Sequence, residues 1–92
     1  MIHTFACGDT AALFISKPVP RFKNIERVSR RKLLQLVAAT ELNSLRISPA
    51  NRLEMLKGSR KGQHSIRIND QWRLCFMWQS DGAHSVEIVD YH

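Results

Sequence analysis

The chain ends in an acid, an aromatic ring and an imidazole, Asp90-Tyr91-His92, directly after an apolar stretch. Histidine exchanges protons near neutral pH. Aspartate can orient a histidine or act as an acid or base itself. Tyrosine can stack on a nucleobase. These three side chains could therefore move protons and hold a base, provided that cations for a phosphate lie close to them.

Cations that could bind such a phosphate come from the middle of the chain. Arg67 and Arg73 alternate with apolar neighbours, so both are expected on the sheet face that points away from the core. Lys57 immediately precedes the break at Gly58. Guanidinium groups match phosphate oxygens in pairs and stabilise the added charge of a pentacoordinate phosphorus. Such a surface could cleave RNA without a metal ion, because the 2′-hydroxyl that DNA lacks can serve as the nucleophile.

The second half of the chain is predicted to form the sheet that positions these groups. Asp81-Gly82 is a strong hairpin turn signal, and residues 52–56 fit either a short strand or an extended lead-in. The result would be a three-stranded antiparallel meander with one apolar face. The stretches that alternate apolar and polar side chains are 64–69, 72–79 and 86–91.

The first half of the chain is predicted to cover the apolar face of this sheet. Ile2 and Phe5 would anchor the initial strand. Pro18 and Pro20 interrupt the chain, and residues 17–24 are expected to be its most mobile segment. Because helices and strands are segregated, the predicted class is α+β, with two N-terminal helices packed on a small twisted antiparallel sheet. The expected strand and helices cover residues 1–6, 10–16 and 25–45.

The composition predicts a single domain over residues 1–92. It is 43% hydrophobic and 24% charged, which is ordinary for a soluble domain. We find no apolar run near the ~18 residues of a membrane helix and no secretory signal, so no membrane partner is expected. Cys7 and Cys75 are far apart, which favours a reducing cytoplasm. The four histidines lack metal-ligand spacing, so neither a metal nor a cofactor is predicted.

The charge balance favours a polyanionic partner. Fourteen Lys and Arg stand against eight Asp and Glu, a formal charge of +6, which favours nucleic acid. An acidic protein or an anionic membrane surface would satisfy the same field, and a solvated helix face explains the first of two basic clusters equally well. The clusters are Arg21, Lys23, Arg27, Arg30, Arg31 and Lys32, and Arg52, Lys57, Arg60, Lys61, Arg67 and Arg73.

These motifs together resemble the HigB toxins, including the GraT-like subgroup, in the RelE/ParE superfamily of bacterial toxin–antitoxin systems. The resemblance extends over essentially the whole chain. It implies a RelE-like α+β fold and a metal-independent endoribonuclease that cuts mRNA in the ribosomal A site. It rests on Leu56-Lys57-Gly58, on Asp70-Gln71-Trp72-Arg73-Leu74-Cys75-Phe76 and on Val89-Asp90-Tyr91-His92.

The resemblance also implies a role for each site residue. Lys57 and Arg73 would bind the scissile phosphate, Asp90 and His92 would be the acid–base pair, and Tyr91 would position or stack on a base. Helix cations would touch ribosomal RNA, while the basic loop and Arg67 are expected to follow phosphates. These further contacts are Arg27, Arg30, Arg31, Lys32, Arg60, Lys61 and Arg67.

Glu54 departs from the family pattern, because some members carry a histidine shortly before the Lys-Gly pair. This acid near Lys57 could weaken the phosphate field or serve as the general base.

The implied partner is a cognate HigA antitoxin with a helix-turn-helix domain, and the pair would repress its own operon, so operator DNA would be bound only through the antitoxin. Two other functions stay open. A ParE-like relative would poison DNA gyrase through the same fold and would not need Asp90-Tyr91-His92 beside Lys57. A plain nucleic-acid-binding module would bind backbone phosphates without cleaving them.

Overall fold

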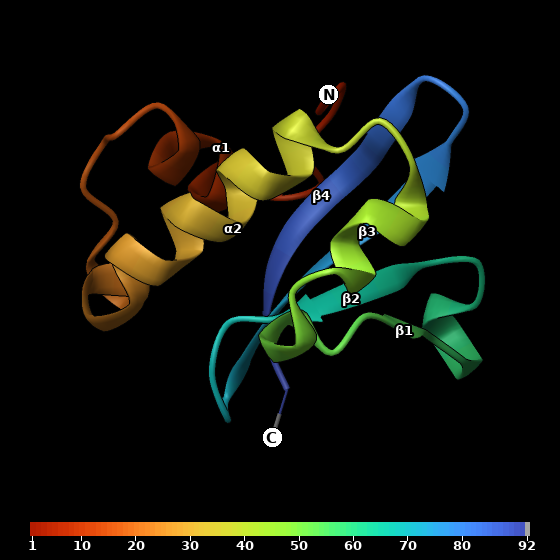
Figure 1. Ribbon diagram of the computed structural model, residues 1–92. Coiled ribbons are helices and arrows are strands. Elements are labelled where there is room, and N and C mark those ends of the chain that lie inside the picture. Colours follow the sequence, from red (N-terminus) through yellow and green to blue (C-terminus); the bar gives the residue numbers. More distant parts are fainter. Residues whose placement is uncertain (92) are drawn as a thin grey trace.

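The computed structural model describes residues 1–91 and shows two helices packed on one face of a four-stranded antiparallel sheet (Figure 1). This confirms the α+β class. The sheet has one strand more than the predicted meander, because residues 54–55 pair with the next strand. His92 lies outside the described residues. The elements are α1 (Gly8–Phe14), α2 (Glu26–Ala38), β1 (Glu54–Met55), β2 (His64–Arg67), β3 (Trp72–Gln79) and β4 (Gly82–Asp90), in the sheet order β1-β2-β3-β4.

The alternation read from the sequence is the one that the sheet adopts. Ile66 pairs with Leu74, and Leu74 with Ile88, so these three side chains form one row facing the helices. All three are buried in a core that also contains Leu33 and Leu36 of α2. Removal of this apolar surface from water, at about 25 cal/mol per Å², holds the helices on the sheet.

The N-terminal segment lies along β4 without forming a regular strand. Ile2 and Phe5 make isolated parallel bridges to Ala83 and Val86. Both side chains pack against the core. The two residues predicted as anchors therefore do anchor the segment, although residues 1–6 are not a continuous strand.

The two prolines do not leave a loose linker. Pro20–Ile25 forms a 3-10 helix that runs directly into α2, and Pro20 stands at its start, where a missing N–H costs little. Phe22 is fully buried, with its ring edge-on to Trp72 at 5.5 Å between centroids. The expectation of a mobile segment over residues 17–24 does not fit this packing.

The helix expected over residues 25–45 is two shorter helices. α2 ends at Ala38, and the backbone of Ala39 is extended. A separate 3-10 helix, Leu42–Arg46, follows and buries Leu45. Among residues 1–91, no helix has the length and apolarity that crossing a bilayer requires.

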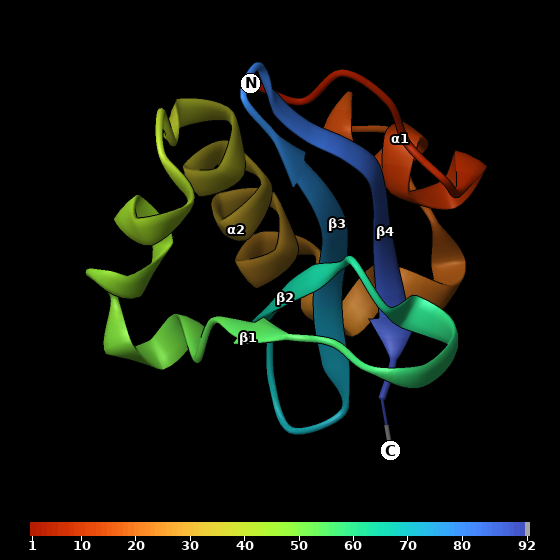
Figure 2. The ribbon, with the colours of Figure 1, turned by 90° about the vertical axis from the view of Figure 1, so that its right-hand side faces the viewer.

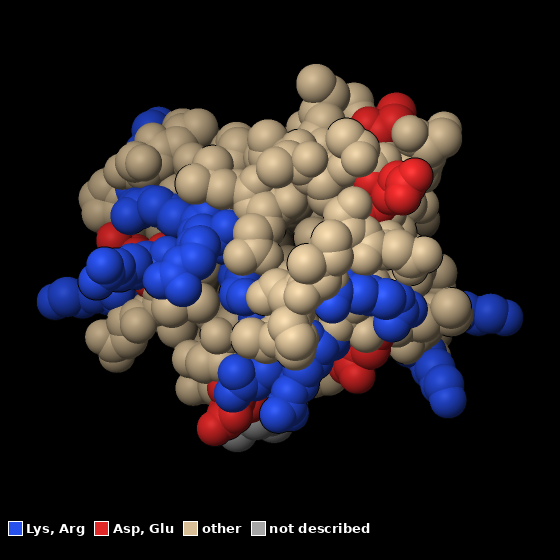
Figure 3. All heavy atoms as spheres, viewed as in Figure 1, with Lys and Arg blue, Asp and Glu red and all other residues tan. Residues whose placement is uncertain are grey.

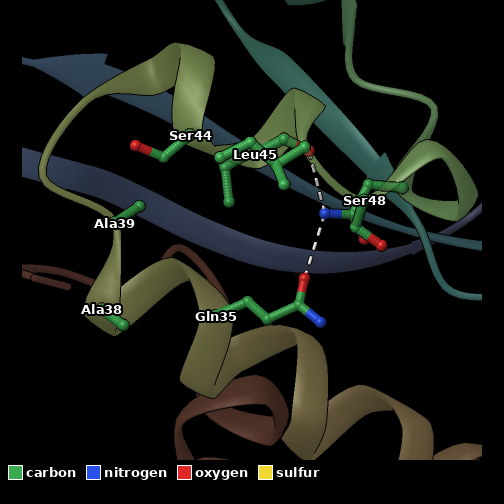
Figure 4. Close-up of a pocket in the computed structure, with 8 residues that line it drawn as sticks. Gln35, Ala38, Ala39, Ser44, Leu45 and Ser48 are labelled. Carbon is green, nitrogen blue, oxygen red and sulfur yellow. Dashed lines mark hydrogen bonds between the residues drawn. The ribbon is translucent and has the colours of Figure 1, made fainter.

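Lys32 lies inside the protein and not on the basic surface of α2. It is 7% exposed, and its Nζ donates to Oδ1 of Asn51 at 2.5 Å. The amide of Asn51 donates in turn to Oε1 of Gln35 and to the carbonyl of Leu45, both at 3.0 Å, beside a surface pocket (Figure 4). The expectation that Lys32 contacts RNA does not fit this position, because its ammonium group links α2 to the 3-10 helices.

The pH dependence of stability should report this burial. Burial lowers the pKa of Lys32, and the charges of Arg31 and Arg67 add to the effect. The Lys32 ammonium group then holds its proton more tightly in the unfolded chain than in the folded protein. The free energy of unfolding should therefore increase as the pH rises above the lowered pKa. Urea unfolding of wild type and Lys32→Met, between about pH 8 and the ordinary lysine pKa of 10.5, should show a smaller rise of stability in the variant. Lys23→Met, at an exposed position, is the control; an unchanged rise in Lys32→Met would contradict the assignment.

Candidate functional site

The sheet face opposite the helices carries most of the groups that the sequence singled out. Directly opposed residues of antiparallel strands point to the same side, so two cross-strand rows share this outer face. Tyr91, two residues after Val89, extends the outer face beyond the end of β4. The rows are Ser65–Cys75–Glu87 and Arg67–Arg73–Val89, with Glu54 of β1 opposite Ser65.

The β1–β2 hairpin curves over this outer face. β1 and β4 are the two edges of the sheet, yet Arg60, from the loop after β1, donates Nη1 to Oε1 of Glu87 on β4 at 3.1 Å. In Figure 2 this loop lies on the viewer's side of the sheet, in front of β4. Cys75 is fully buried although it lies outside the main core. Burial raises the pKa of its thiol, so Cys75 is a poor nucleophile.

Arg73 is held rigidly on the outer face. Its side chain is 11% exposed. Nε donates to Oγ of Ser65 at 2.7 Å, and Nη2 donates to the carbonyl of Arg52 at 2.7 Å. Oε1 of Glu54 lies 3.7 Å from Nε. A guanidinium fixed in advance costs no reorganisation when negative charge develops beside it.

The ring of Tyr91 lies against this guanidinium. Cζ of Arg73 is 5.8 Å from the ring centroid, within the range of a cation–π contact. The backbone N–H of Tyr91 donates to the carbonyl of Gln71 at 2.6 Å, which ties residue 91 to the turn before β3. With 43% of its surface exposed, Tyr91 still presents ring area to a ligand.

Asp90 lies on the other side of β4. It stands opposite Trp72 in the strand register, and its Oδ2 accepts a hydrogen bond from Nε2 of Gln71 at 3.0 Å. The structure therefore brings Arg73 and Tyr91 together and places the carboxylate of Asp90 away from them. The catalytic expectation for His92 falls on a residue outside the described range.

Lys57 is exposed at the start of the loop after β1. It lies three residues beyond Glu54, which is roughly 10 Å of extended chain. Gly58 has a φ of 65°, in the left-handed region that favours glycine. The chain therefore turns sharply just after Lys57, at the edge of the face that holds Arg73.

The remaining cations that were expected to contact RNA fall into different environments. Figure 3 shows Lys and Arg gathered over the first half of α2 and around β1, β2 and their loop. Although α2 packs on the core side of the sheet, both basic regions are visible from this one direction. Arg27, Arg31 and Lys61 are exposed, whereas the pairs Arg30–Glu26, Arg60–Glu87 and Arg67–Asp70 are joined by ion pairs.

Sequence reasoning missed two contributors to this site. Ser65 belongs to the alternating stretch 64–69, but only the strand register shows that it supports Arg73. The carbonyl of Arg52 contributes through the backbone, and a backbone contact of this kind leaves no signal in residue type.

The fold places the protein in a class of small YoeB-like α+β domains. It is similar to a chain of the YoeB–YefM complex from Staphylococcus aureus, with a TM-score of 0.62 over 100% of this chain and 98% of that one. The two sequences are 17% identical, so this likeness establishes the fold alone.

Sequence comparison gives the family. The model of HigB-like toxins, described as RelE-like toxins of the type II toxin–antitoxin system HigB, matches residues 18–92. Toxin HigB-1 of Vibrio cholerae is 46% identical over 69 residues, 75% of this chain and 72% of the relative. Endoribonuclease HigB of Proteus vulgaris is 30% identical over 95 residues, 100% of both chains. The chain belongs to the HigB-like family of type II toxins, and a toxin of such a system has a cognate antitoxin.

Proposed function

We propose that the protein is an endoribonuclease that arrests growth by cutting mRNA in the ribosomal A site. Its full-length similarity to endoribonuclease HigB supports the activity. The observation that carries the proposal is the fixed guanidinium of Arg73, with the ring of Tyr91 and the carboxylate of Glu54 beside it. We also propose that the protein falls in the GraT-like subgroup, on the motifs quoted above.

In the proposed reaction, Arg73 binds the non-bridging oxygens of the scissile phosphate and stabilises the charge of the pentacoordinate phosphorus. Lys57 supplies a second cation, and Tyr91 stacks on a base. The 2′-hydroxyl gives its proton to a base and attacks the adjacent phosphorus. The bond to the 5′-oxygen breaks, and that oxygen takes up a proton. The products are a 2′,3′-cyclic phosphate and a 5′-hydroxyl, with no metal ion required.

Glu54 is the candidate base that the geometry favours. Its side chain is 51% exposed and lies 3.7 Å from Nε of Arg73. A scissile phosphate bound to Arg73 would therefore bring the 2′-hydroxyl of the adjacent ribose near this carboxylate. Asp90 is held by Gln71 on the other side of β4. His92, next to Tyr91 in the chain, stays the proposed acid for the leaving oxygen.

The two basic regions suggest how the protein would sit on the ribosome. Arg27 and Arg31 are exposed on α2, away from the outer sheet face, and would contact ribosomal RNA while that face holds the mRNA. The proposed antitoxin is of the HigA type, with a helix-turn-helix domain, and operator DNA would be bound only through it. The proposed place of action is the cytoplasm, where translation occurs.

Mapping of RNA ends tests the proposal. The purified protein is added to a translation reaction, to the same mRNA without ribosomes, and to a gyrase supercoiling assay. We expect cleavage of translated mRNA only, leaving 5′-hydroxyl ends. Gyrase inhibition with intact mRNA would favour a ParE-like toxin, and RNA binding without cleavage would favour a plain binding module; either result would overturn the proposal.

A further inference from the structure

Three potential metal ligands meet at the end of the sheet far from Tyr91. His3 comes from the N-terminal segment, and Asp81 and His84 come from the β3–β4 hairpin. One ligand atom of each lies within 4.8 Å of the others. Nε2 of His3 is 3.5 Å from Oδ2 of Asp81, and Nε2 of His84 is 2.8 Å from Oδ1. Each imidazole therefore points its Nε2 atom at the carboxylate of Asp81, although His3 and Asp81 are 78 residues apart in the sequence.

The backbone holds these ligands in place. The N–H of Ala83 donates to the carbonyl of Met1, and the N–H of His3 donates to the carbonyl of Ala83, both at 2.8 Å. Gly82, with a φ of 128°, lies so close to Met1 that a Cβ there would collide with the Met1 carbonyl. A glycine at this position thus permits the approach that brings His3 to the hairpin.

The two imidazoles also support each other. Their rings stack, with centroids 4.8 Å apart and planes 20° from parallel. Nε2 of His3 lies 2.7 Å from the carbonyl oxygen of Asp81 as well.

We propose that His3, Asp81 and His84 bind one divalent transition-metal ion, with Zn²⁺ the best fit and a fourth position open to water. Two imidazoles and one carboxylate are a ligand set that Zn²⁺ favours, whereas Mg²⁺ prefers oxygen ligands. Tetrahedral bonds of about 2.0–2.2 Å place ligand atoms roughly 3.3–3.5 Å apart. The 3.5 Å between His3 and Asp81 already meets this spacing, and small side-chain rotations bring in the third ligand.

This site would be structural and not part of RNA cleavage. His84 stands opposite Met77 and Val89 opposite Arg73, so four residues of β3, roughly 13 Å, separate the site from Arg73. An ion held between the hairpin and residue 3 would fasten the N-terminal segment to β4. Because the three ligands meet only in the folded chain, the ion would stabilise the fold by mass action.

Calorimetric titration with ZnCl₂ and thermal unfolding of the chain without a polyhistidine tag test the proposal. We expect one Zn²⁺ per chain, and a Tm increase of about 10 °C when zinc is 100-fold above its Kd. Mg²⁺ should give no shift. His84→Ala should weaken the Kd at least about tenfold, as loss of supporting shell residues alone does, and Ser80→Ala in the same turn should leave it unchanged.

Hydrogen exchange locates the ion independently of any variant. In wild type, zinc should slow exchange at the amide of Ala83, which holds Met1. A wild-type chain that binds no zinc would overturn the proposal. So would an equal Tm increase in His84→Ala, or zinc protection confined to other parts of the chain.

Discussion

Replacing Arg73 by alanine should lower the rate of ribosome-dependent mRNA cleavage by about 10²–10³-fold, the usual effect of removing one preorganised donor from a site of developing negative charge. Arg73 is the cation whose position the structure fixes best, through Ser65 and the carbonyl of Arg52. The loss should appear in single-turnover cleavage of translated mRNA and as loss of growth arrest on expression.

Two further variants separate the role of Arg73 in cleavage from its role in folding. Arg73→Lys keeps the charge but loses the planar fork, so most of the activity should still be lost. Arg46→Ala removes the same charge from an exposed position outside the proposed site, and should cleave like the parent. Because Arg73→Ala also breaks hydrogen bonds inside the protein, we expect about 1–3 kcal/mol less stability, measured by urea unfolding. Parental cleavage by a folded Arg73→Ala protein would show that the site is assigned to the wrong residue.

The strands of the sheet could be predicted because their signals lie between residues that are close in the sequence. Alternation along 64–69 and 72–79 arises because one face of the sheet meets the core, while Arg67 and Arg73 point to the other face. Asp81-Gly82 marked the hairpin correctly, since Gly82 adopts a φ of 128° that other residues avoid. The outward position of Arg67 and Arg73 followed from the same period of two.

Some side-chain positions could not be predicted, because they depend on strand register and on contacts between segments that are distant in the sequence. Lys32 fits a charged helix surface by type, yet Asn51, 19 residues away, draws it inside. The ion pair of Arg60 with Glu87 across the curved sheet spans 27 residues. The two prolines correctly indicated a break in the chain, but the burial of Phe22 holds the segment around them in place.

The charge distribution of the site also differs from the one that the composition suggests. A chain of +6 charge places two acids, Glu54 and Glu87, beside cations on its outer sheet face. Each pair lowers the net field that a phosphate would meet. Glu87 forms an ion pair with Arg60, in the loop that follows β1. Glu54 lies beside Arg73, the central cation. Its carboxylate is therefore the one that could either act as the general base or weaken phosphate binding.

Replacing Glu54 by glutamine should lower the cleavage rate at saturating substrate by about 10²–10⁴-fold, the usual contribution of a general base. RNA binding should stay the same or become tighter, because the change removes a negative charge 3.7 Å from Nε of Arg73. Single-turnover cleavage and equilibrium binding to a non-cleavable mRNA with a 2′-deoxy nucleotide at the scissile position would separate these effects.

Glu87→Gln is the matched control, since it removes the same charge from the same face while leaving Glu54 in place. Its pairing with Arg60 predicts a modest loss of stability and little change in the chemical step. If Glu54→Gln cleaves as fast as the parent, or faster, then Glu54 only weakens the attraction for phosphate. In that case the proton must go to a residue of the terminal triplet, and Asp90 would have to leave Gln71 in order to receive it. A slow Glu54→Gln variant with unimpaired binding would instead place the proton-accepting group on β1, beside the cation that holds the phosphate.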